Sequence, residues 1–111
     1  MQSQIEGKPI FVDVYTDWCQ HCKWMDKHVF NQVEVGELMN REFINVKVNA
    51  EKRWGVRFAK QYLVQAYPTF LFLDPKGEIL LISTGSKPAE RFLNEARKAL
   101  KNSEQDTVES R

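Results

Sequence analysis

The chain has two cysteines, which stand two residues apart in the segment Trp18-Cys19-Gln20-His21-Cys22-Lys23. This segment directly follows the run Ile10–Tyr15, which is apolar except for Asp13 and is long enough for a buried strand. Residues i and i+3 share one face of a helix, so a helix that begins near Cys19 brings both thiols together. We therefore expect a fold built around a strand that delivers a cysteine pair to the start of a helix.

The rest of the sequence alternates helical and strand patterns. We expect strands over 9–15, 43–49, 69–73 and 79–83, and helices over 19–28, 31–40, 53–64 and 88–101. In the helix at 53–64, Phe58, Tyr62 and Leu63 should point inward. The order β-α-α-β-α-β-β-α favours parallel pairing of the first strands and an antiparallel final hairpin. It predicts an α/β fold with a mixed central sheet and helices on both faces.

A length of 111 residues predicts one domain, and a chain of this size can bury a substantial core. We expect an N-terminal arm at 1–8, the domain at 9–101 and a disordered polar tail at 102–111. The 16 basic and 15 acidic residues give a net charge of +1, which favours neither nucleic acid nor an anionic membrane as a partner. No apolar run reaches the roughly 18 residues that a membrane span needs. We also expect the protein to be a monomer.

The N-terminus shows no signal peptide, because Met1-Gln2-Ser3-Gln4 is polar. A lone CxxC pair serves in reducing and oxidising compartments alike, so the compartment stays open. If a leader has been removed before Met1, the bacterial periplasm or cell envelope is favoured over the cytoplasm.

The position of the two cysteines assigns them different roles. Cys19 lies at the first helical turn, where unpaired N–H groups and the helix dipole favour a thiolate. Cys22 lies one turn deeper and should be less exposed. We therefore expect Cys19 to attack a partner disulfide and Cys22 to resolve the mixed disulfide.

Three other side chains are candidates to assist this chemistry. Asp13, buried in its strand, should have a raised pKa and could accept the proton of Cys22; alternatively it caps a nearby group at an edge. Lys47 is a candidate ionic partner for Asp13, or else a surface lysine whose stem lies along the protein. His21 would stabilise the Cys19 thiolate and make the couple more oxidising, or is a solvated residue without a role.

Together these residues resemble the thioredoxin superfamily over about residues 8–101. The resemblance rests on the strand at 11–15, the segment Trp18–Lys23, Tyr67-Pro68-Thr69 and Gly85. It implies the thioredoxin fold, with a reduced N-terminal strand and helix, and a cis-proline at Pro68 packed beside the cysteines. It also implies a buried acid at Asp13 with a lysine partner at Lys47. The backbone of Tyr67 would pair with an extended substrate segment, and Trp18 would contribute to the same surface.

The chain is most similar to short thioredoxin-like domains such as the C-terminal domain of DsbD-type thiol:disulfide interchange proteins. In place of the Gly-Pro of thioredoxin it has Gln20-His21. A histidine before the second cysteine also occurs in disulfide isomerases and in the oxidant DsbA. His21 therefore does not determine the direction of electron flow.

Two other function classes compete with redox chemistry. Cys19, His21, Cys22 and His28 offer four metal-ligand side chains within ten residues, but a closed metal site usually takes its ligands from two elements. Haem attachment requires CxxCH, and position 23 is lysine. A protein-interaction module would instead use an apolar surface built from Trp18, Trp24, Trp54 and Tyr67.

The hypothesis that best fits the sequence is a protein thiol–disulfide oxidoreductase, acting as a reductase. Its partners would be protein disulfides or dithiols and an upstream dithiol reductant, with no bound cofactor or metal. A disulfide oxidase or isomerase of the same fold is the alternative within this class.

Overall fold

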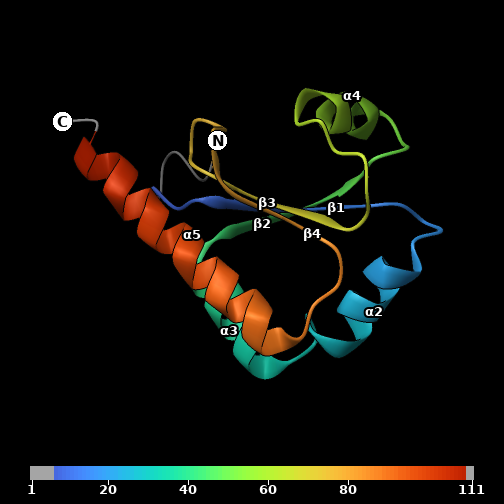
Figure 1. The fold of residues 1–111 in the computed structure, drawn as a ribbon, viewed down its shortest axis with the longest axis horizontal. Coiled ribbons are helices and arrows are strands. Elements are labelled where there is room, and N and C mark those ends of the chain that lie inside the picture. The colour runs from blue at the N-terminus through green and yellow to red at the C-terminus, as the bar shows by residue number, and fades with distance from the viewer. Residues whose placement is uncertain (1–6, 110–111) are drawn as a thin grey trace.

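The structure, a computed structural model, describes the backbone of residues 7–109 and the side chains of residues 7–104. Figure 1 shows its elements. The strands are β1 (Ile10–Tyr15), β2 (Ile44–Asn49), β3 (Thr69–Leu73) and β4 (Ile79–Thr84), and the helices are α2 (Gln20–His28), α3 (Val33–Glu42), α4 (Trp54–Gln61) and α5 (Ala89–Glu109). The expected element order is confirmed, and β1 is the first described element.

The four strands form one mixed sheet in the order β2-β1-β3-β4. β1 pairs in parallel with β2 and antiparallel with β3, and β3 forms an antiparallel hairpin with β4. In this register Asp13 lies between Lys47 of β2 and Phe70 of β3. The predicted mixed sheet is confirmed, and β1 is an inner strand with hydrogen-bonding neighbours on both sides.

Helices cover both faces of the sheet (Figure 1). Successive side chains of a strand point to opposite faces, so the side chains of β1 divide between two cores. Phe11 packs in a core with Met25 of α2, Leu38 of α3 and Phe92 of α5. The second core, under α4, contains Val12, Val14 and Val48 of the sheet and Ala59 of α4. Asp13 shares the face of Phe11 and therefore lies on the side that α2 covers.

The prediction that Leu63 points inward is wrong, because α4 ends at Gln61. Leu63 has a left-handed backbone conformation, with φ 57°, and its side chain is 81% exposed. Its N–H donates to Lys60 O, and the N–H of Val64 donates to Ala59 O, which is the hydrogen-bonding pattern of a Schellman cap. The cap turns the chain so that Val64, rather than Leu63, enters the core.

The predicted disorder at 102–111 is wrong for residues 102–109, over which α5 continues. The Asn102 side-chain amide donates to Leu80 O at 2.9 Å, which ties this part of α5 to β4. Residues 110–111, like residues 1–6 of the expected arm, lie outside the described residues. No helix in the described part of the chain is both long enough and apolar enough to cross a bilayer.

Gly55 allows α4 to approach the end of β2 closely. A Cβ atom at this position would overlap the backbone carbonyl of Asn49 and lie 3.2 Å from Val48 Cγ1. Glycine normally lowers the stability of a helix, so the close approach of α4 to β2 explains why position 55 is a glycine. Gly36, inside α3, has no atom within 4 Å of the position that a Cβ would take.

We predict that Gly55→Ala and Gly36→Ala change stability in opposite directions. Gly55→Ala should lower the free energy of unfolding by roughly 1–3 kcal/mol, because the backbone of Asn49 must move. Gly36→Ala should raise it by about 0.5–1 kcal/mol through helix propensity alone. Urea denaturation of the two variants measures both values. Equal effects of the two substitutions would show that α4 does not need close contact with β2.

Candidate active site

The two cysteines lie at the start of α2 and are joined in a disulfide. Cys19 is the N-cap residue of α2, and its Sγ accepts a hydrogen bond from the backbone N–H of Cys22 at 3.0 Å. Their Cα atoms are 5.3 Å apart. The prediction that Cys22 is the less exposed cysteine is wrong for this oxidised state, with exposed fractions of 3% for Cys19 and 6% for Cys22. The disulfide draws the Cys19 sulfur against the first turn of the helix.

The predicted substrate-contacting residues lie together. The Trp18 ring is 61% exposed and makes an edge-to-face contact with Tyr67, with ring centroids 5.9 Å apart. Its Nε1 donates to the Glu51 carboxylate at 3.0 Å. Tyr67 is joined by a cis peptide bond to the buried Pro68, whose carbonyl accepts the N–H of Gly85. The result is an aromatic pair, exposed at Trp18 and half-buried at Tyr67, directly before the cysteine pair and the cis-proline.

His21, between the two cysteines, is exposed, and its Nδ1 lies 3.3 Å from Ser86 Oγ in the connection from β4 to α5. The next residue of that connection, Lys87, donates its backbone N–H to Met25 Sδ in α2. The Lys87 ammonium is buried against the Phe70 ring and pairs with Glu95 at 3.3 Å and with Ser83 Oγ. The connection is therefore held against α2 at the level of His21.

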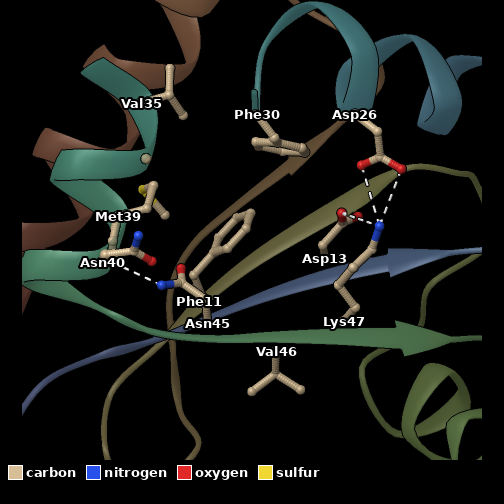
Figure 2. A pocket seen from close by; sticks show the side chains of 11 residues that line it. Phe11, Asp13, Asp26, Phe30, Val35, Met39, Asn40, Asn45, Val46 and Lys47 are labelled. Atoms are coloured by element: carbon tan, nitrogen blue, oxygen red, sulfur yellow. Dashed lines mark hydrogen bonds and ion pairs between the residues drawn. The ribbon is translucent and has the colours of Figure 1, made fainter. Parts of the chain in front are cut away.

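Asp13 is a buried carboxyl beside two surface charges (Figure 2). Its Oδ2 lies 3.9 Å from Lys47 Nζ, whereas Lys47 lies 3.2 Å from Asp26 Oδ2. Burial raises the pKa of Asp13 to about 6; the Lys47 ammonium opposes this increase and the Asp26 carboxylate adds to it. Lys47 is thus shared, with Asp26 as its nearer partner.

The Asp13 side chain lies in a hollow of about 260 Å³ between α2, α3 and β2 (Figure 2). Phe11 and Phe30 form part of its apolar wall, and the half-exposed side chains of Lys47 and Asp26 stand on its outer side. The Asp13 Oδ1 atom makes no hydrogen bond within the described residues, so one lone pair is free to take a proton. The hollow extends from the Asp13 carboxyl past Lys47 and Asp26.

The sequence did not identify three residues of this site. Asp26 lies four residues after Cys22, and that spacing on a helix was a usable signal for one shared face. Glu51, which accepts the Trp18 N–H, and Ser86, next to His21, come from distant segments that only the tertiary structure brings to the site. Local patterns give no signal for such contacts.

The alternative metal-binding set does not gather in the structure. Cys19 and Cys22 are bonded to each other, and the His28 ring packs against Trp24, with ring centroids 5.1 Å apart. Across the described residues, no three or more side chains of His, Cys, Asp or Glu form a group that could hold a metal ion.

Comparison with known proteins explains this arrangement. The family model of the thioredoxin-like domain matches residues 2–100. The chain belongs to the thioredoxin-like family. The expected resemblance to DsbD-type proteins is also confirmed, since the thiol:disulfide interchange protein DsbD of Yersinia pestis (strain Pestoides F) is 33% identical over 94 residues. That match covers 82% of the chain and 16% of the relative, so the chain spans about a sixth of the relative's length.

Solved structures agree with the family. A thioredoxin from Thermus thermophilus superimposes with a TM-score of 0.81 and 29% identity, covering 88% of this chain and 78% of that one. A putative disulphide-isomerase from Bacteroides thetaiotaomicron gives a TM-score of 0.79 and 37% identity, covering 89% and 82%. The fold is the thioredoxin fold, and its cysteine pair is the redox-active CxxC centre typical of a thiol–disulfide oxidoreductase.

We predict that Asp13→Asn stabilises the oxidised protein increasingly as the pH rises. The folded-state pKa of about 6 lies above the ordinary value of 3.8, so the folded protein holds a proton that the unfolded chain has lost between these pH values. Wild-type stability therefore falls from pH 4 to pH 6 on account of this group. The gain from Asp13→Asn should be near zero at pH 4 and reach about 3 kcal/mol at pH 8.

The measurement is the difference in the free energy of unfolding between Asp13→Asn and wild type, taken at each pH. Other carboxylates contribute equally to both proteins and cancel. Lys47→Met, compared with Lys47→Met/Asp13→Asn, should move the midpoint of the curve to higher pH, because the opposing ammonium is lost. A difference that does not change with pH would show that the folded-state pKa of Asp13 is not raised.

Proposed function

We propose that the protein is a disulfide reductase that passes two electrons from its own dithiol to a protein disulfide. The Cys19 thiolate attacks one sulfur of the substrate disulfide, which forms a mixed disulfide and releases the other substrate sulfur as a thiolate that takes a proton. The Cys22 thiolate then attacks the Cys19 sulfur. This step releases the second substrate sulfur and forms the Cys19–Cys22 disulfide, the state present in the structure.

The single observation that carries this proposal is the hydrogen bond from the backbone N–H of Cys22 to Cys19 Sγ at the N-cap of α2. In the reduced state the same N–H would point at a thiolate, and the helix dipole adds favourable potential. Stabilising the thiolate lowers the pKa of the Cys19 thiol, and the thiolate is the nucleophile in disulfide exchange.

Asp13 is the proposed proton acceptor for Cys22. It lies on the face of β1 that α2 covers, and a carboxyl whose pKa is about 6 is mostly ionised at pH 7. Such a group takes up a proton readily, because its pKa lies near the working pH. Lys47 would keep the carboxylate charged, and the hollow beside it would release the proton to solvent.

The Trp18–Tyr67 pair and Pro68 are the proposed contacts for the substrate chain. The Trp18 ring is exposed and the Tyr67 ring is half-buried, and the backbone of Tyr67 would pair with an extended segment of the substrate. After one turnover an upstream dithiol reductant would restore the Cys19–Cys22 dithiol. A location in the bacterial periplasm or cell envelope, and a monomeric state, stay predictions; the similarity to DsbD supports the first.

We predict that Cys19→Ser and Cys22→Ser differ in how they react with insulin. With dithiothreitol as the electron source, Cys19→Ser should abolish the catalysed reduction of insulin disulfides, because no nucleophile remains. Cys22→Ser, reduced beforehand and freed of dithiothreitol, should accumulate a covalent complex with insulin, visible on non-reducing gels, because no second thiol resolves the mixed disulfide. Insulin reduction that survives Cys19→Ser unchanged would rule out this enzyme.

Oxidation or isomerisation is the second candidate function, and His21 favours it. An imidazole beside Cys19 stabilises the thiolate and hence the reduced form, which makes the couple more oxidising. The similarity to a putative disulphide-isomerase supports the same alternative.

The reduction potential separates the two directions. A reductase should lie near the value of thioredoxin, about −270 mV, and an isomerase nearer −180 mV. We predict a wild-type reduction potential closer to that of thioredoxin. In His21→Ala the potential should be about 30 mV more negative than in wild type, equivalent to about 1.4 kcal/mol. Equilibration with glutathione measures both. A wild-type potential at the isomerase end would contradict the proposed direction, and an unchanged potential in His21→Ala would contradict the tuning role.

A further inference from the structure

The outer face of α2 and Ser86 enclose a second hollow, of about 540 Å³, which begins beside the cysteine pair. His21, Lys23, Lys27 and His28 supply four basic side chains to its lining. No carboxylate lines it. Lys23 and Lys27 therefore place positive charge on one side of the disulfide, although the whole chain has a net charge of only +1.

Within the described residues, the two lysines of this hollow form no close ion pair, unlike lysines on other sides of the site. Lys47 pairs with Asp26 and Asp13, and Lys52 pairs with Asp17 at 2.9 Å. Neither Lys23 nor Lys27 lies within 4 Å of a carboxylate oxygen in the described part of the chain. Lys23 lies near enough to the Asp17 carboxylate to help lower its pKa, but Asp17 makes its close ion pair with Lys52. The charge of Lys23 and Lys27 is therefore available to an anionic group that approaches the disulfide.

The hollow also has an aromatic wall and a defined inner end. Trp24 is 42% exposed and packs against the His28 ring. At the inner end, Ser86 lies next to His21 between the two cysteines. A chain occupying the hollow would therefore run from the disulfide along α2, with its apolar parts against Trp24.

The spacing of the lysines indicates which kind of anion fits. Lys23 and Lys27 are four residues apart on a helix, which is about 6 Å along its axis. Alternate side chains of an extended strand are about 7 Å apart and point to the same side. Two carboxylates at alternate positions of an extended peptide would therefore face the two ammonium groups together.

We propose that this hollow binds an acidic segment of the protein substrate, with carboxylates at alternate positions close to the disulfide that is reduced. The inference rests on the proposed reductase function. The opposite arm of the same substrate chain would lie over Trp18 and Tyr67. The substrate would thus meet an aromatic pair at Trp18 and Tyr67 and, in the hollow, two lysines beside Trp24.

The test compares two synthetic peptide disulfides that differ only at two alternate flanking positions, Glu in one and Gln in the other. The quantity measured is the ratio of their kcat/KM values. We expect the ratio to favour the Glu peptide roughly threefold to tenfold at low ionic strength, through two exposed ion pairs. It should fall towards one at about 0.5 M salt, where charges are screened within a few ångströms.

The variant Lys23→Gln/Lys27→Gln should lose most of this preference. Lys98→Gln/Lys101→Gln removes the same amount of charge from the exposed face of α5 and should keep the preference for the Glu peptide. A ratio near one in wild type, or an equal loss in both double variants, would overturn the proposal. Binding of free glutamate or a small dicarboxylate with the same salt dependence, but no preference between peptides, would assign the hollow to a small anion instead. Failure to reduce either peptide would contradict the proposed function itself.

Discussion

The inner position of β1 is the constraint on which the rest of the structure depends. Its backbone is hydrogen-bonded to a strand on each side, and its two faces are covered by separate cores. Every side chain of the strand must therefore fit an apolar setting, and Phe11, Val12 and Val14 do. Asp13 does not, and its burial costs stability whenever the carboxyl is ionised. The central strand β1 therefore also carries a carboxyl group whose ionisation lowers the stability of the fold, and this group lies next to the helix with the cysteines.

In the proposed mechanism, electrons and protons would move on different sides of α2. Electrons would cross at Cys19, next to the exposed Trp18 ring and the half-buried Tyr67 ring. The proton would leave from Asp13 through a hollow between α2, α3 and β2, on another side of α2. A large substrate protein docked over the disulfide would therefore leave the route of the proton open. A single helix, α2, contributes to both surfaces because it is exposed on one side and faces the sheet on the other.

The sequence predicted what local patterns determine and missed what distant contacts determine. The period-two pattern that includes Val48 predicted β2, apolar runs predicted β1 and β3, and the charge within the first of these runs singled out Asp13. The Schellman cap that exposes Leu63 has no glycine to indicate it, so helical periodicity extended the helix too far. Asp26 was detectable only through its spacing from the second cysteine. Ser86 reaches the site from a connection 65 positions after His21, which no local pattern could indicate.

The course of α5 has a practical consequence for handling the protein. The helix starts close to the connection that packs against α2, and its described end lies at the opposite end of the long axis from α2 (Figure 1). A linker or solid support attached beyond α5 would thus hold the protein with its cysteine pair turned away from the attachment point. Macromolecules as large as folded proteins would still reach the disulfide on such a surface, which suits the protein to immobilised formats.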